Sequence, residues 1–275
     1  LQNSAVMNPP VKRKGNPVRA ADIFFPFNQV CKGARRFGHI TCTPDGDGIN
    51  RRFPLLFAFR GGYIPSLTFA LALDFLSVGE NDIEVHFGSH VLLKNARLPG
   101  REPAVIRIPI DQKGRVILNY TSPWKDSFIS FPADLLLESE NDPQAAHNLY
   151  EAAGGGLVVL SNISTWNKDY GTGVFDEVYP LSGIHLTLLN MILSGGWMSE
   201  PGPVELAVIG MILAAAVLLA AMKVKPVSFL AVSAVIVAAY WAVNIGLFVY
   251  AHRLASVLPQ TAALMLSVPA MLLYR

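Results

Sequence analysis

The sequence predicts an α/β domain, with α+β as the alternative, followed by an all-α bundle of three transmembrane helices. Segments of strand and helix character alternate over residues 21–200, as in domains that mix both kinds of element. The remainder, from about Val204 to Arg275, is almost free of charged side chains. The whole chain is 52% hydrophobic and only 15% charged. Ordinary soluble domains are about 25% charged, so the composition favours a membrane-associated chain.

The first part of the chain predicts an irregular lead-in and then the start of the domain. Residues 1–20 are rich in Pro, Asn and basic side chains, which is typical of irregular structure. After them we expect a short helix, two strands joined as a hairpin by an Asp- and Gly-rich turn, and a second helix: Phe27–Arg36, Phe37–Thr43, Ile49–Arg60 and Leu67–Ser77. Ser66 directly precedes the second helix and is predicted to cap its free N–H groups.

Short strands and helices alternate through the rest of the domain. Strands are predicted at Ile83–Phe87, His90–Leu93, Val105–Ile108 and Arg115–Tyr120. Helices are predicted at Pro132–Glu138, Pro143–Ala153 and Gly183–Leu193. The apolar stretch Leu157–Ser161 predicts a central strand that is covered on both faces.

The C-terminal part divides into three apolar segments that contain no Asp, Glu, Lys or Arg: Leu206–Met222, Pro226–Ala251 and Leu254–Tyr274. A helix of about 20 apolar residues crosses the hydrocarbon core of a bilayer. We therefore expect membrane spans at about 204–222, 227–251 and 254–274. Asn244 is expected either to hydrogen-bond across helices or simply to pack, and Pro259 and Pro269 either to kink the third span or to pack.

The loops between the spans predict their orientation. The link between the first two spans carries Lys223 and Lys225, which the positive-inside rule places in the cytoplasm. Residues 1–203 are then extracytoplasmic and Arg275 is cytoplasmic, although Arg253 adds one positive charge to the outer loop. The chain begins with Leu1 and has no signal segment near its start, so we expect it to be a fragment with an upstream signal or anchor.

The turn Asp45–Asn50 resembles the start of a calcium-binding loop. Such a loop requires a bidentate Glu at its twelfth position, where this chain has Leu56. The motif therefore favours a tight turn, with calcium binding as the alternative. His185 stands in the first turn of a predicted helix, where a capping or packing role competes with a binding role.

Turn and loop side chains supply the candidate ligand-binding residues: Asp45, Asp47, Arg51, Asp169, Asp176 and His185. Solvated carboxylates without a ligand are the alternative interpretation. The sequence shows no nucleophile–base pair, no metal-ligand spacing and no basic stripe with interleaved aromatics. We therefore assign no catalytic or metal-binding residue, and we expect no cofactor and no nucleic acid. Cys31 and Cys42 are expected either to form a disulfide outside the cytoplasm or to remain free, partly buried thiols.

Three stretches together resemble the CHASE2 extracytoplasmic sensor domain of bacterial receptors: Gly38–Ile40 with Pro44–Arg52, Val116–Pro123 with Phe128, and Leu157–Ser161 with Asp169 and Pro180–His185. The resemblance covers residues from about 20 to 275, including the three trailing spans. Ser161 departs from the family, which usually has Gly at that position. From the resemblance we expect this chain to lack the family's N-terminal half and its anchor, and to be cut from a longer receptor whose catalytic domain lies outside it.

The resemblance implies a sensor that binds an unknown extracytoplasmic ligand and relays the signal through the inner membrane of a bacterium. The implied output is a cytoplasmic class III adenylate or guanylate cyclase that makes a cyclic nucleotide such as cAMP, and the receptor is expected to be a homodimer. A receptor histidine kinase, a serine/threonine kinase or a diguanylate cyclase is an alternative output. A membrane-anchored enzyme and a membrane assembly subunit without output remain the other hypotheses.

Overall fold

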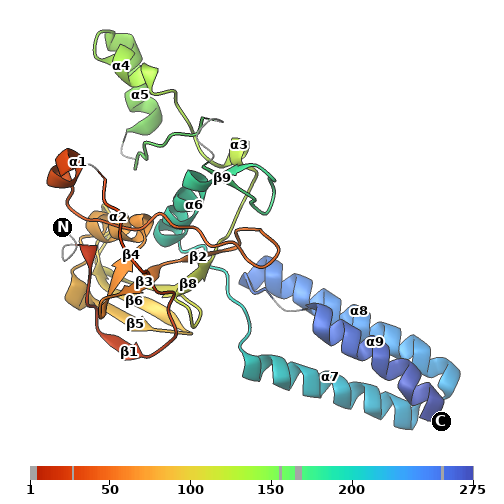
Figure 1. Ribbon diagram of the computed structural model, residues 1–275. Coiled ribbons are helices and arrows are strands. Elements are labelled where there is room, and N and C mark those ends of the chain that lie inside the picture. The colour runs from red at the N-terminus through yellow and green to blue at the C-terminus, as the bar shows by residue number, and fades with distance from the viewer. Residues whose placement is uncertain (1–4, 27, 155–156, 165–168, 255–256, 275) are drawn as a thin grey trace. The chain divides into compact units, whose positions relative to one another are not determined.

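The computed structural model describes residues 5–26, 28–154, 157–164, 169–254 and 257–274. It divides into two compact units, Leu1–Gly196 and Trp197–Arg275. The first unit contains the β-sheets and several helices, and the second is helical (Figure 1). The predicted mixture of α and β elements followed by helices is therefore confirmed.

The largest sheet has four strands in the order β1-β5-β6-β7. The strands are β1 Val11–Arg13, β5 Ile83–His86, β6 His90–Ala96 and β7 Ala104–Pro109. β1 runs parallel to β5, and the other pairs are antiparallel. Ile83, Val85, Val91 and Leu93 are fully buried, whereas their neighbours along the two strands are partly exposed. This period of two is what the sequence predicted for β5 and β6.

Two further pairs of strands form separate two-stranded sheets. β3 (Leu56–Phe59) and β4 (Gly62–Pro65) form an antiparallel hairpin. Its two turn residues, Arg60 and Gly61, both have positive φ angles, 47° and 87°. This is the backbone of a two-residue type I′ turn, which matches the twist of the strands. β2 (Arg52–Pro54) pairs instead with β8 (Arg115–Ile117), which is distant in sequence.

Three sequence predictions in this unit are wrong. Phe37–Thr43 forms no strand, and His39 makes only an isolated bridge to Ser66. The hairpin is formed by β3 and β4 on either side of Arg60 and Gly61, and not by Phe37–Thr43 with Ile49–Arg60 as predicted. Leu157–Ser161 is not a strand either, because none of the residues that the structure describes pairs with it, and Leu160 is 82% exposed.

The predicted lead-in is not irregular throughout, because residues in it pair with the domain. Val11 is paired with Val85 in the main sheet, and the backbone N–H of Met7 donates to the Tyr63 carbonyl at 2.8 Å. Arg19 forms a bridge with Ala58. Local composition could not reveal these pairings, since their partners lie far along the chain.

Two helices pack against each other in the first unit, α2 (Leu67–Phe75) and α6 (Leu181–Ser194). Ser66 caps α2 as predicted, since its Oγ accepts a hydrogen bond from the Phe69 N–H at 3.2 Å. α6 ends at Gly195, which takes the left-handed conformation typical of a helix C-terminus. The remaining elements of this unit are α1 Asn28–Gly33, η2 Glu80–Asp82, α3 Trp124–Ser127, α4 Asp134–Ser139, α5 Pro143–Ala153, β9 Tyr170–Gly171 and β10 Tyr179–Pro180.

The second unit consists of α7 (Pro203–Lys223), α8 (Pro226–Ala251) and α9 (Val257–Tyr274), each in contact with the other two. Its core is formed by Val217, Ala220, Ala221, Phe229 and Leu264. α7 and the Ser228–Ala251 part of α8 are long and apolar enough to cross a membrane. A third span in α9 stays a prediction.

Polar side chains in the helical unit bond mostly within or between neighbouring helices. The indole N–H of Trp241 on α8 donates to Thr261 Oγ1 on α9 at 3.1 Å. Asn244 does not reach across to another helix, because its Nδ2 donates to the Tyr240 carbonyl of the preceding turn at 2.6 Å. Pro269 lies inside α9.

Candidate functional site around Gly38–Arg52

The segment Gly38–Arg52 crosses the start of α2 and brings several of the candidate residues together. The N–H of His39 donates to the Pro65 carbonyl at 2.9 Å, and the His39 carbonyl accepts from the Leu67 N–H at 2.8 Å. A Cβ atom at Gly38 would overlap the backbone of Leu67. The close approach to α2 therefore requires glycine at this position.

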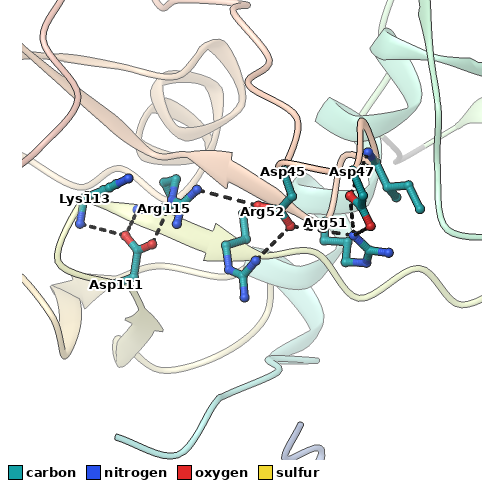
Figure 2. A network of polar contacts seen from close by, with 8 residues as sticks. Asp45, Asp47, Arg51, Arg52, Asp111, Lys113 and Arg115 are labelled. Atoms are coloured by element: carbon teal, nitrogen blue, oxygen red, sulfur yellow. Dashed lines mark hydrogen bonds and ion pairs between the residues drawn. The ribbon is translucent and has the colours of Figure 1, made fainter. Parts of the chain in front are cut away.

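An ion-pair network anchors the middle of the segment to β2 and β8, and it comprises Asp45, Asp47, Arg51, Arg52, Asp111 and Arg115 (Figure 2). The half-buried Asp45 carboxylate lies 2.8 Å from Arg52 Nη1 and 3.7 Å from Arg115 Nη1. Arg115 also donates from Nε to Asp111 Oδ2 at 2.8 Å. Opposite charges thereby hold together two stretches that are distant in sequence, Asp45–Arg52 and Asp111–Arg115.

Asp47 forms the more exposed arm of the network. Its two carboxylate oxygens lie 2.9 and 2.7 Å from Arg51 Nη1. Hydrogen bonds from the Arg51 guanidinium, and then from the Ile49 N–H, lower the pKa of Asp47. Gly48, with a φ of +83°, closes the turn between these residues. Arginine therefore occupies the carboxylates that a calcium ion would need.

No group of three or more His, Cys, Asp or Glu residues in the described part of the chain is arranged to hold a metal ion. This geometry agrees with Leu56 at the position where a calcium loop requires Glu. Asp45–Asn50 forms a tight turn, in which the Gly48 N–H donates to the Asp45 carbonyl at 2.9 Å.

A buried cluster of two histidines and their neighbours includes the start of the segment. It comprises His39, His185, Phe53, Phe57 and Thr68. The His39 ring stacks on Phe57 with centroids 4.1 Å apart. Phe53 lies edge-on to His185 at 5.0 Å. His185 Nδ1 is 2.8 Å from Thr68 Oγ1, which joins α6 to α2. His185 on α6 thus packs against α2, and a packing role was one of its two sequence interpretations.

Burial controls the charge of both histidines. It lowers the pKa of His39 to about 3, and the nearby His185 lowers it further, while the Pro54 carbonyl opposes the change. Burial also lowers the pKa of His185, against the opposing effects of the Ile40 carbonyl and Asp169. Both rings are therefore neutral near pH 7.

The two cysteines are free thiols in the structure, so the disulfide that the sequence allowed is not present. Cys31 Sγ donates to the Pro26 carbonyl at 3.4 Å, and Cys42 Sγ donates to the Ile40 carbonyl at 3.8 Å. Burial, assisted by the charge of Asp169, raises the pKa of the Cys42 thiol to about 12. Asp169, one of the candidate residues from the sequence, therefore influences the pKa of both Cys42 and His185.

The end of the segment is held by residues that sequence reasoning missed. The Asn50 N–H donates to the Thr172 carbonyl at 2.9 Å, and Asn50 Nδ2 donates to the same oxygen at 3.2 Å. Tyr120 Oη donates to the Asn50 carbonyl at 2.7 Å. No local pattern indicates these contacts, because each joins positions more than fifty residues apart.

Asp176 is the candidate that the structure places elsewhere. Its carboxylate accepts a hydrogen bond from the Trp124 N–H at 2.8 Å, at the start of α3. Trp124 packs edge-on to Tyr179 with ring centroids 5.8 Å apart. Asp176 therefore positions the α3 turn and is not in direct contact with the ion-pair network.

Several buried polar atoms of the segment lack a hydrogen-bond partner among the described residues: both ring nitrogens of His39, Thr43 Oγ1 and Asn50 Oδ1. Buried polar atoms are nearly always paired with protein or ordered water. A water or small polar molecule that reached these atoms would find unpaired hydrogen-bonding groups within a single segment.

An α/β unit that continues into helices long enough to span a membrane is the organisation of a membrane-anchored domain. The chain belongs to the CHASE2 domain family, which matches residues 3–222 and so includes most of α7. CHASE2 domains are extracytoplasmic sensor domains of signalling receptors. No curated protein and no solved structure matches the chain.

Proposed function

We propose that this chain is the sensor and membrane-relay segment of a bacterial receptor whose output is a cytoplasmic class III adenylate or guanylate cyclase. The observation that carries the proposal is the CHASE2 match, which extends from the α/β unit through most of the first apolar helix. Sensing and membrane passage are then functions of one continuous segment. The receptor is proposed to act as a homodimer in the inner membrane.

The proposed topology has three spans, α7, α8 and α9, with residues 1–203 outside. α9 has 18 residues. At 1.5 Å per residue it is about 27 Å long, close to the ~30 Å of a bilayer core. Arg253 opposes this orientation with one positive charge in the outer loop, where it lies 2.8 Å from Glu205, against two lysines in the inner link. Lys223 and Lys225 then dominate the charge asymmetry.

The proposed ligand is a small polar molecule held at the Gly38–Arg52 segment. The unpartnered atoms of His39, Thr43 and Asn50 supply hydrogen-bonding groups there. Such a ligand shifts the receptor only by binding its two states with different affinity. Movement of the segment against α2 and α6 is the proposed change, since His39 and His185 connect it to both helices.

Reporter fusions test the topology directly. A periplasm-active reporter and a cytoplasm-active reporter are fused in turn after residue 200, in the link at residue 224, and after residue 253. We expect periplasmic activity at 200 and 253 and cytoplasmic activity at 224. The reversed pattern at 200 and 224 refutes the sensor proposal, and a cytoplasmic position for 253 refutes the three-span topology alone.

The output is tested by the coding sequence downstream of Arg275 and by cyclic-nucleotide production of the whole receptor. A cyclase domain with that activity supports the proposal. A kinase domain in its place would replace the proposed output and keep the sensor role.

A further inference from the structure

The segment that leads into α7 is attached to the loop between α8 and α9. The Ser199 N–H donates to the His252 carbonyl at 3.2 Å, and the Leu254 N–H donates to the Ser199 carbonyl at 2.8 Å. Ser199 and Arg253 form a parallel β-bridge through these bonds. This backbone contact therefore joins the residues just before α7 to the residues just after α8.

A charge pair reinforces the same junction. Arg253 Nη2 lies 2.8 Å from each carboxylate oxygen of Glu205, which is in the first turn of α7. The Arg253 N–H also donates to the Leu247 carbonyl at 3.1 Å, and His252 ends α8 in the left-handed conformation with a φ of 51°. Arg253 is thus tied to the end of α8 by its backbone and to the start of α7 by its side chain.

We propose that these contacts form a clip that makes α7, α8 and α9 respond as one body to movement of the sensor's exit segment. The clip comprises Ser199, Glu205, His252, Arg253 and Leu254. The exit segment, residues 195–202, directly follows α6, the helix that contains His185. A shift of Ser199 is passed to the α8–α9 loop by two backbone hydrogen bonds, as well as along the chain into α7. This inference rests on the proposed receptor function. It identifies the contacts that pass a movement of the sensor domain to the three helices.

The clip also gives the arginine of the outer loop an acidic partner. In the proposed topology Arg253 lies at the outer membrane surface, opposite to the preference of basic residues. Its pairing with Glu205 balances that charge and uses it to connect two helix ends. Glu205 at the N-terminus of α7 is in addition favourably placed toward the helix dipole.

Hydrogen exchange of the full chain in lipid nanodiscs tests the clip. We expect the amides of Ser199 and Leu254 to be protected in the native chain. Glu205→Gln and Arg253→Met should each speed exchange at both amides by up to about fivefold, the factor that an exposed ion pair supports. The charge swap Glu205→Arg with Arg253→Glu should restore protection. Lys223→Met, at the other end of α7, is the matched control and should leave both amides unchanged.

Ser199→Pro tests the relay, because it removes the N–H that donates to His252 and leaves the α7 sequence intact. Faster exchange at Leu254 in this variant supports coupling between the exit segment and the α8–α9 loop. Unchanged exchange at Leu254 overturns it, as does the lack of protection at both amides in the native chain.

Cross-linking provides a second readout that does not depend on exchange. In a chain with Cys31→Ser and Cys42→Ser, the pair Ser199→Cys and Arg253→Cys should form a disulfide under mild oxidation, whereas Ser199→Cys with Ser228→Cys should not. If the first pair fails to cross-link while fusion reporters still place residue 200 outside, the clip is refuted and the receptor proposal stands. Reversed reporters refute the receptor proposal itself.

Discussion

We expect His39 to lower the stability of the first unit in acid. Replacing His39 with phenylalanine should remove part of this loss of stability. The ring lies between Phe53 and Phe57, with centroids 5.7 and 4.1 Å away. Neither ring nitrogen makes a hydrogen bond of good geometry to a described residue, although the Pro54 carbonyl is near enough to favour the charged ring. His39→Phe therefore keeps an aromatic ring in an aromatic site and removes only the titrating group and its unpaired nitrogens.

The size and sign of the effect follow from the lowered pKa. In the unfolded chain His39 binds a proton below its ordinary pKa of 6.5, whereas in the folded chain it does so only near pH 3. The unfolded state thus binds more protons in this range, and the free energy of unfolding falls as the pH drops from 6.5 toward 3. At about 1.4 kcal/mol per pH unit, the loss is about 2 kcal/mol at pH 5 and about 4 kcal/mol at pH 3, where the folded-state histidine is itself half protonated.

Pulse proteolysis in urea measures this loss for the outer unit of the full chain in nanodiscs. Between pH 7 and pH 5, the native protein should lose about 2 kcal/mol more stability than His39→Phe. Phe57→Leu is the matched control, because it weakens the same packing and keeps the histidine, so its pH dependence should follow that of the native protein. An equal pH dependence in the native protein and in His39→Phe would refute the assignment of acid sensitivity to His39.

Two further predictions concern the ion-pair network and the thiols. Asp45→Ala should reduce the free energy of unfolding by roughly 1–3 kcal/mol, because it leaves the half-buried Arg52 and Arg115 without their shared carboxylate. Asp47→Ala, on the more exposed arm, should cost much less in the same urea titration, and an equal cost would contradict this division of the network. For the thiols, mass spectrometry of the native protein should find two free cysteines that iodoacetamide leaves unmodified at pH 8, because Cys31 is buried and the pKa of Cys42 is raised to about 12. A bridged pair, or rapid labelling of Cys42, would contradict the structure.

The candidate site could be predicted in part, because some of its residues stand in recognisable local patterns. Asp45, Asp47 and Arg51 lie in a turn that Asp and Gly residues make evident, and the structure confirms that turn. The partners of the turn could not be predicted. Asp45 meets Arg115, which is brought to it by the pairing of β2 with β8, and no local property of either segment determines that pairing.

The fold shows the same division between local and distant effects. The Ser66 cap, the alternation in β5 and β6 and the long apolar helices follow from short-range preferences, since each depends on neighbours within one or two helical turns or on the strand period. The stretch Leu157–Ser161 shows where this reasoning fails. An apolar run becomes a strand only when another strand pairs with it, and here none does among the described residues.

By itself, the sequence determined that an α/β unit precedes helices able to enter a membrane, because apolar length and periodicity are properties of the chain alone. Only the tertiary structure decided what the charged and polar side chains do. It paired Asp45 with arginines, buried His39 against two phenylalanines, and joined Glu205 to Arg253. These outcomes depend on which distant segments come into contact, and the free energy of such contacts arises from burial and charge in the folded state rather than from any local pattern.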